Sequence, residues 1–235
     1  MTDYNDIGIN KELNIARIRK LLSIGLIAAV LVLIGDMLLG WSVIDENSDI
    51  GVFSKFIGIS DARIFWSALL GMIGIPLEGL CYFGIYRLIA YRSEKRAHSY
   101  RTGILGVLTF GGFVHVMCCA AVYYLNRIYE LKPEILETEV MQFAKYFLFP
   151  ASIVFFIFFL VLNITQIAAF IKGETPCPKW CAVFTPAIGV IVIVLAKIIG
   201  NYPLVNALST GWISIGGICT FGGLLLFGLK NINLE

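Results

Sequence analysis

The sequence is poor in charged residues and contains only two histidines. Charged residues make up 14% of its 235 residues, whereas hydrophobic residues make up 58%. A soluble globular domain usually has about 25% charged and about 45 to 50% apolar residues, so this composition excludes that class. The mean hydropathy of +0.84 instead indicates an integral membrane protein.

The chain also lacks a strong charge of either sign, a low-complexity tract and an internal repeat. Its formal net charge is only +2, and its basic residues cluster in loops instead of forming a stripe with interleaved aromatic residues. Because nucleic-acid-binding surfaces are strongly basic, we expect no nucleic-acid partner. The length suits one domain, so we predict a single membrane domain over residues 1–235.

Six apolar runs are long enough to span a membrane, because about 20 residues at about 1.5 Å per residue cross a hydrocarbon core of about 30 Å. They are Leu21–Ser42, Ile64–Tyr91, Gly103–Asn126, Phe143–Ile171, Trp180–Gly200 and Val205–Leu229. The predicted fold is therefore all-α, a polytopic transmembrane bundle of six spanning helices.

Lysine and arginine are distributed unequally between the two sides of this bundle. Twelve of the 18 lie before the first run, around the second and fourth loops or after the sixth run, and six lie on the other side. By the positive-inside rule, both termini are expected in the cytoplasm. We therefore predict a multi-pass protein of the cell membrane, with membrane lipids as its first partners.

Three ionisable side chains lie inside the predicted helices. Glu78 and His115 fall close to the midpoints of their helices, and Asp36 lies roughly 7 Å outward at about 1.5 Å per residue. A charge at the bilayer centre costs at least about 2.5 kcal/mol, so these residues should face the bundle interior or a water-filled cavity. A hydrogen bond between Glu78 and His115 would form an acid/base pair, with Asp36 assisting.

Each of these residues also has a purely structural interpretation. Pro76 beside Glu78 can kink the helix and free a carbonyl for a binding site, yet proline and glycine are frequent in membrane helices for packing alone. His115 could be a buried histidine bonded to a backbone carbonyl. Asp36 could be neutralised by Lys197 in an ion pair, although Lys197 can also extend outward on its apolar stem.

The sixth run is rich in small residues, including Gly211, Ser214 and Gly217 on one side. Such residues let helices approach closely, so packing is the first interpretation. The alternative is a polar outer vestibule that admits a substrate. The candidate substrate-binding residues at or near such a mouth are Trp41, Lys197, Asn206 and Trp212.

No motif in the sequence identifies a bound metal or a cofactor. Cys177 and Cys181 have a C-x3-C spacing, which is not the redox C-x-x-C motif and which needs further cysteines or histidines to form a zinc site. Two histidines cannot supply the axial ligands of a membrane dihaem protein. Asp36, Glu78 and His115 match a two-carboxylate, one-histidine metal set in composition, but separate helices give no spacing rule that tests it. We therefore predict no metal site, and the cofactor remains unknown.

Four features together suggest a family resemblance. They are the run Gly35–Trp41, the mid-helix Glu78 and His115, the run Pro176–Trp180 before the fifth segment, and the glycine-rich last helix. In these features the chain resembles a bacterial family of six-helix membrane proteins of unknown function. The resemblance implies a bacterial inner membrane and no particular chemistry. The zinc-dependent membrane hydrolases of the ceramidase and adiponectin-receptor type need several histidines that this chain lacks.

We expect an intramembrane enzyme or binding protein for a lipidic small molecule, in which Glu78, His115 and Asp36 act in catalysis or anchoring. One alternative is a small proton-coupled transporter in which the same residues relay protons. Another is a structural or assembly protein whose polar groups hold helices together. Two broken helices in an inverted repeat would favour the transporter, and the sequence offers one break, at Pro76.

Overall fold

Helices form all the regular secondary structure of the computed structural model, which describes residues 13–232 and has no strand among them. Within residues 13–232, five helical segments are long and apolar enough to cross a membrane. They are α1 (Ile15–Gly40), α2 with α3 (Asp61–Cys81 and Phe83–Ala90), α4 with the π-helical η3 and α5 (Glu94–Gly106, Val107–Gly111 and Gly112–Leu131), α6 with the π-helical η5 and α7 (Leu136–Phe143, Ala144–Leu148 and Phe149–Ile171), and α10 with η7 and η8 (Trp212–Gly223, Leu224–Gly228 and Leu229–Asn231). The shorter elements are η2 (Gly51–Phe56), η4 (Pro133–Ile135), η6 (Lys179–Val183), α8 (Ile188–Lys197) and α9 (Pro203–Thr210).

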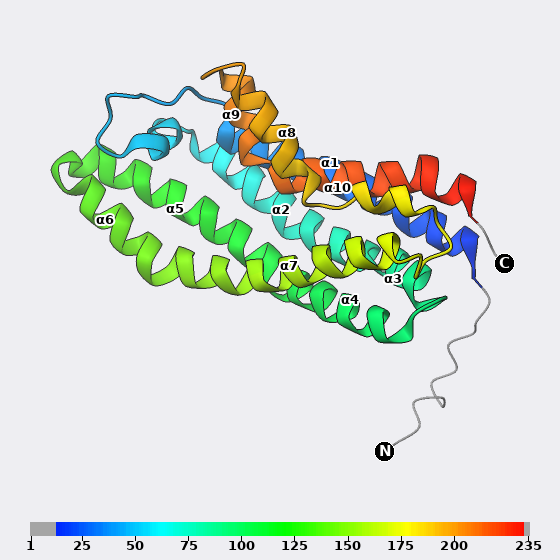
Figure 1. Ribbon diagram of the computed structural model, residues 1–235. Helices are drawn as coiled ribbons and strands as arrows, with labels where there is room; N and C mark the ends of the chain where they lie inside the picture. The colour runs from blue at the N-terminus through cyan, green and yellow to red at the C-terminus, as the bar shows by residue number, and fades with distance from the viewer. Residues whose placement is uncertain (1–12, 233–235) are drawn as a thin grey trace.

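The helices form an elongated bundle (Figure 1). In it, α1 packs against α2, α9 and α10, while α4 packs against α7 and α5 packs against α2. The beginning of α1 and the end of the last helix lie at the same end of the bundle (Figure 1). The α5–α6 hairpin lies at the opposite end, beside the loop that carries η2 (Figure 1).

The segment from α4 to α5 is longer than a membrane requires. It contains 38 residues, which extend about 57 Å at about 1.5 Å per residue, whereas the hydrocarbon core is about 30 Å thick. The hairpin end of α5 also carries exposed ion pairs. We therefore infer that the α5–α6 hairpin extends beyond the hydrocarbon region, together with η2.

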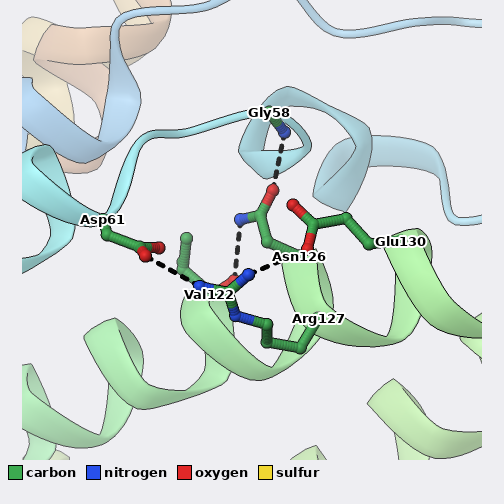
Figure 2. A network of polar contacts seen from close by, with 6 residues as sticks. All are labelled: Gly58, Asp61, Val122, Asn126, Arg127 and Glu130. Atoms are coloured by element: carbon green, nitrogen blue, oxygen red, sulfur yellow. Dashed lines mark hydrogen bonds and ion pairs between the residues drawn. The ribbon is translucent and has the colours of Figure 1, made fainter.

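Asn126 fastens the η2 loop to α5 (Figure 2). Its Oδ1 accepts a hydrogen bond from the Gly58 backbone nitrogen at 2.6 Å. Its Nδ2 donates to the Phe56 carbonyl and to the Val122 carbonyl, both at 2.9 Å. One amide side chain on α5 thus supplies hydrogen-bond partners for two backbone groups of an irregular, partly buried loop.

Arg127 forms a second, more exposed connection at the same end (Figure 2). It contacts Asp61 at the beginning of α2 at 2.7 Å and Glu130 on its own helix at 2.8 Å. Exposed ion pairs of this kind contribute about 1 kcal/mol or less. The buried amide contacts of Asn126 therefore position the η2 loop more strongly than these charges do.

The predicted span Trp180–Gly200 is not one helix. The structure instead has η6, an irregular stretch and then α8, which contains only 10 residues. Two amide side chains of α7 bind the broken backbone: Asn163 Oδ1 accepts from the Ala187 nitrogen at 2.8 Å, and Gln166 Nε2 donates to the Phe184 carbonyl at 2.7 Å. These bonds explain the buried polar residues of α7, since non-helical backbone inside a membrane needs protein partners.

The last helix and α8 cross at very short range. A Cβ atom added at Gly216 would lie 2.7 Å from the carbonyl carbon of Pro186, and one added at Gly189 would lie 3.0 Å from the Gly216 nitrogen. Any larger side chain would force the two backbones apart. For Gly216, the packing interpretation of the glycine-rich helix is confirmed.

The predicted all-α fold is confirmed for residues 13–232, with five long apolar helices. The sixth crossing and the cytoplasmic termini remain predictions. Helix α4 begins at Glu94 and not at the predicted residue 103, because Ser93 Oγ caps it by accepting from the Arg96 nitrogen, and the prediction counted only apolar residues. Lys11, which entered the charge count, and the outermost parts of the predicted domain, residues 1–12 and 233–235, lie outside the described residues.

Candidate functional site: a polar cavity within the bundle

Asp36, Glu78 and His115 line one cavity of about 220 Å³. Each comes from a different helix: Asp36 from α1, Glu78 from α2 and His115 from α5. All three side chains belong to buried residues. The depth argument from the sequence predicts this convergence, and the structure reveals how the three groups are paired.

Asp36 is held by two neighbours across the cavity wall. Its Oδ2 accepts a hydrogen bond from Ser214 Oγ of α10 at 2.6 Å. Its Oδ1 lies 3.5 Å from Nδ1 of His115. The carboxyl group therefore links α1 to both α5 and α10.

The surroundings of His115 favour a ring that carries a hydrogen on Nε2. Nε2 lies 3.0 Å from the Ser67 carbonyl oxygen, which can only accept, so Nε2 carries a hydrogen. Nδ1 faces Asp36 Oδ1, and a neutral ring protonated on Nε2 offers only a lone pair there. A hydrogen bond between Nδ1 and Oδ1 would therefore need a hydrogen on Nδ1 or on the carboxyl group.

Glu78 is bonded within its own helix. Its Oε1 accepts a hydrogen bond from the Tyr82 hydroxyl, one turn later, at 2.9 Å. A Cβ atom added at Gly217 would lie 3.2 Å from Glu78 Cδ, so the small residue leaves room for the carboxyl group. The predicted hydrogen bond between Glu78 and His115 is thus replaced by a Glu78–Tyr82 bond and an Asp36–His115 pair.

Ser67, His115 and Asp36 stand in the order of a nucleophile, base and acid triad, with Ser67 Oγ 3.5 Å from His115 Nε2. Ser67 is fully buried and does not line the cavity. Cys119, whose Sγ lies 3.6 Å from Ser67 Oγ, is also buried away from the cavity. A ligand in the cavity therefore meets His115, while Ser67 and Cys119 lie behind the ring and outside the lining.

Aromatic rings form much of the remaining wall. Trp212 stacks against Phe156 with ring centroids 6.2 Å apart and meets Phe159 edge-on at 5.8 Å, and all three line the cavity. Ligand sites usually combine such an apolar lining with a few convergent polar groups. The cavity suits a molecule that is mostly apolar and carries a polar group.

A second cavity of about 190 Å³ lies toward the α5–α6 hairpin. Its wall is aliphatic and aromatic, with side chains from η2, α5, α6 and η5, and it shares Cys118 and Thr210 with the first cavity. The two chambers are therefore neighbours. One presents ionisable groups and the other almost none.

Comparison with known proteins assigns the chain to a family. The profile of DUF6796, described as a family of unknown function, matches residues 4–231. The chain belongs to this family. No curated protein and no solved structure matches the chain. The family assignment agrees with the expected resemblance to an uncharacterised family, and it attaches no chemistry to DUF6796.

Of the four candidate substrate-binding residues in this member of DUF6796, only Trp212 lines the polar cavity. Trp41 is 49% exposed. Asn206 is buried but donates to the Ser42 carbonyl at 2.9 Å and to Asn201 at 2.8 Å, so it organises the loop after α1.

Lys197 differs most from the expectation. It is exposed, and the Asp36 carboxyl group that was expected to pair with it is bonded to Ser214 and His115 instead. Lys197 is the last residue of α8. The predicted ion pair between Asp36 and Lys197 is therefore corrected.

Sequence reasoning missed Ser67, Tyr82 and Ser214, which bind the three ionisable groups. Tyr82 follows Glu78 by four residues, so helical spacing alone could have identified it. Ser67 and Ser214 lie on other helices, and no local pattern connects them to their partners. Within residues 13–232, no three Asp, Glu, His or Cys side chains are grouped closely enough to hold a metal ion.

Proposed function

We propose that this member of DUF6796 is an intramembrane binding protein or enzyme for a lipidic small molecule, with six membrane crossings and cytoplasmic termini in a bacterial inner membrane. The observation that carries the proposal is the convergence of Asp36, Glu78 and His115 from three helices on one largely aromatic cavity. Ionisable groups inside a membrane are costly, and they are seldom present without a ligand, ion or proton to bind.

The chemistry of this site is acid/base chemistry. Asp36 and His115 lie 3.5 Å apart, and a histidine lining a cavity can give a proton to a ligand oxygen or take one from it, with Asp36 as its neighbouring acid. Glu78 lies in the same wall with one oxygen bonded to Tyr82, which leaves its second oxygen for a ligand hydroxyl or amine. Membrane lipids are the class of molecule from which we expect the ligand to come.

A small proton-coupled transporter is the second candidate, and the discontinuous helices favour it. The segment that ends in α8 is irregular before Ile188, and the next segment is interrupted at Gly211, between α9 and α10. Broken helices near the substrate are typical of secondary transporters. A proton carried by Asp36 or His115 would then accompany the substrate. A purely structural role is the third candidate, in which the cavity holds only water.

Native mass spectrometry with lipid analysis of gently purified protein tests the proposal. We compare the wild-type protein with Glu78→Gln and His115→Ala. The matched controls are Glu94→Gln and His98→Ala, which change the same residue types in an exposed pair on α4. A co-purifying molecule that is released by both cavity variants and kept by both controls supports the lipid site.

Two other outcomes separate the candidates. If the same lipids remain bound to the cavity variants and the controls, the lipid-site proposal is contradicted. A pH-driven substrate flux in proteoliposomes that both cavity variants abolish would then support the transporter. If no molecule is retained, no flux occurs and the cavity variants fold normally, the structural role is favoured.

A further inference from the structure

Lys55 reaches into the bundle from the η2 loop without a counter-ion. Its Nζ donates a hydrogen bond to Thr210 Oγ1 of α9 at 3.0 Å and lies 4.8 Å from the centre of the Phe56 ring. No carboxylate among residues 13–232 lies within ion-pair distance of it. A partly buried ammonium group with only a neutral hydroxyl as partner lacks the compensation that buried charges normally have.

A second positive charge further disfavours the protonated form of Lys55. Burial, and then the charge of Lys197 on α8, lower the pKa of Lys55 to about 8. Among the described residues, Lys197 is the charged group that acts on Lys55, and the two lysines carry charges of the same sign. An anion placed here would relieve the repulsion and regain part of the lost hydration energy.

The position of Lys55 links this charge to the apolar second cavity. Phe53 and Phe56, which flank it in η2, both line that cavity. Thr210, which accepts its hydrogen bond, lines the second cavity and the polar cavity alike. A positive group therefore stands beside an apolar chamber, at the end of the bundle where the α5–α6 hairpin leaves the membrane.

We propose that Lys55, with Thr210 beside it, binds the carboxylate or phosphate of a single-chain amphiphile whose hydrocarbon chain occupies the second cavity. The inference rests on the proposed function for the entry of a lipidic ligand into the bundle, and it names the class of that ligand. Because the two cavities share Thr210, one molecule can place its anionic group at Lys55 and another part of itself near His115.

The test compares ligands that differ only in their head group. Binding of radiolabelled dodecanoate, dodecyl phosphate and dodecanol is measured on protein in lipid nanodiscs, with inorganic phosphate as a competitor. We expect the two anionic ligands to bind at least about tenfold more tightly than the alcohol, the effect of one charge-assisted hydrogen bond. This comparison uses the wild-type protein and so does not depend on the folding of a variant.

Variants then connect the preference to Lys55. Lys55→Gln keeps a donor for Thr210 and should remove the preference for anionic ligands, while Lys55→Arg should retain it. Lys145→Gln is the matched control, because this lysine of η5 is exposed and contacts only the Tyr146 ring in the described contacts. Equal binding of dodecanoate to the wild-type protein and Lys55→Gln would overturn the inference. Competition by inorganic phosphate as strong as that by dodecyl phosphate would overturn it in favour of a free-anion site.

The outcome for Lys55 is separable from that for the polar cavity. Loss of the anionic preference in Lys55→Gln, with no effect of His115→Ala on binding, supports the anion site and contradicts the proposed role of the acid/base groups. The converse result contradicts the anion site and leaves the polar cavity as the ligand site.

Discussion

Gly71→Ala should displace His115 and break its two polar contacts. A Cβ atom at position 71 would overlap Cδ2 and Nε2 of the His115 ring and would lie 2.6 Å from its Cγ. Ordinary carbon contacts need about 3.5 Å or more, so the ring or α2 must move by at least roughly 1 Å. A ring displaced away from position 71 cannot keep both of its contacts, that of Nε2 with the Ser67 carbonyl oxygen at 3.0 Å and that of Nδ1 with Asp36 Oδ1 at 3.5 Å.

The expected loss of stability follows from these contacts. Overpacking by one methyl group in a filled interior costs about 1 to 3 kcal/mol. A buried polar group that loses its partner costs about 1 to 3 kcal/mol more. We therefore expect Gly71→Ala to lower the free energy of unfolding by roughly 3 kcal/mol. Gly112→Ala is the control, because the new Cβ would lie 3.7 Å from Pro76, at an ordinary contact distance.

Unfolding of the purified protein in nanodiscs, followed by steric trapping, measures this difference. Combining Gly71→Ala with His115→Ala removes the ring that the new methyl group meets, so the double variant should be no less stable than His115→Ala alone. Equal stability of Gly71→Ala and Gly112→Ala would refute the reasoning. So would additive losses in the double variant, because they would place the clash somewhere other than His115.

Three further predictions concern other parts of the bundle. Ser214→Ala should cost about 1 to 3 kcal/mol of stability in the same assay, because a buried carboxyl oxygen loses its 2.6 Å donor, whereas Ser209→Ala, whose buried hydroxyl has no partner, should cost nothing. Asn126→Ala should destabilise the protein by more than Arg127→Ala. The first variant breaks the three hydrogen bonds of a buried amide side chain, whereas the second breaks exposed ion pairs of about 1 kcal/mol or less. The reverse order would contradict this view of the η2 loop. Dodecanoate binding should weaken as the pH rises above about 8. Burial and the charge of Lys197 lower the pKa of Lys55 to about 8, and only the protonated lysine attracts an anion. An affinity that is constant from about pH 6 to about pH 10 would contradict the anion site.

The sequence predicts the existence of the polar cavity better than its internal bonding. Depth alone places Glu78 and His115 at one level of the bundle, with Asp36 further outward, and all three should face the interior because lipid cannot satisfy such groups. Which partners they choose depends on how the helices are rotated and how closely they approach. Ser214 reaches Asp36 from a residue 178 positions away, so no local pattern could reveal the contact.

The broken fifth segment illustrates the same limit. Its apolar composition is typical of a continuous span, and residues 180–200 were predicted as one helix. The structure places Asn163 and Gln166 of α7 against the backbone of Ala187 and Phe184, which lets the chain leave the helical conformation inside the bundle. Composition records how apolar a segment is, but the partners of its backbone are set by tertiary packing.

Determining the structure of the protein in a lipid bilayer, at a resolution that shows ordered water, tests the central claim most directly. If the polar cavity is a ligand site, non-protein density should lie within hydrogen-bond distance of His115 or Glu78 and be elongated, continuing past Thr210 toward Lys55. His115→Ala should lose that density without loss of the fold. A cavity that contains only separate water molecules in both proteins, or that is closed by its own side chains, would contradict the claim.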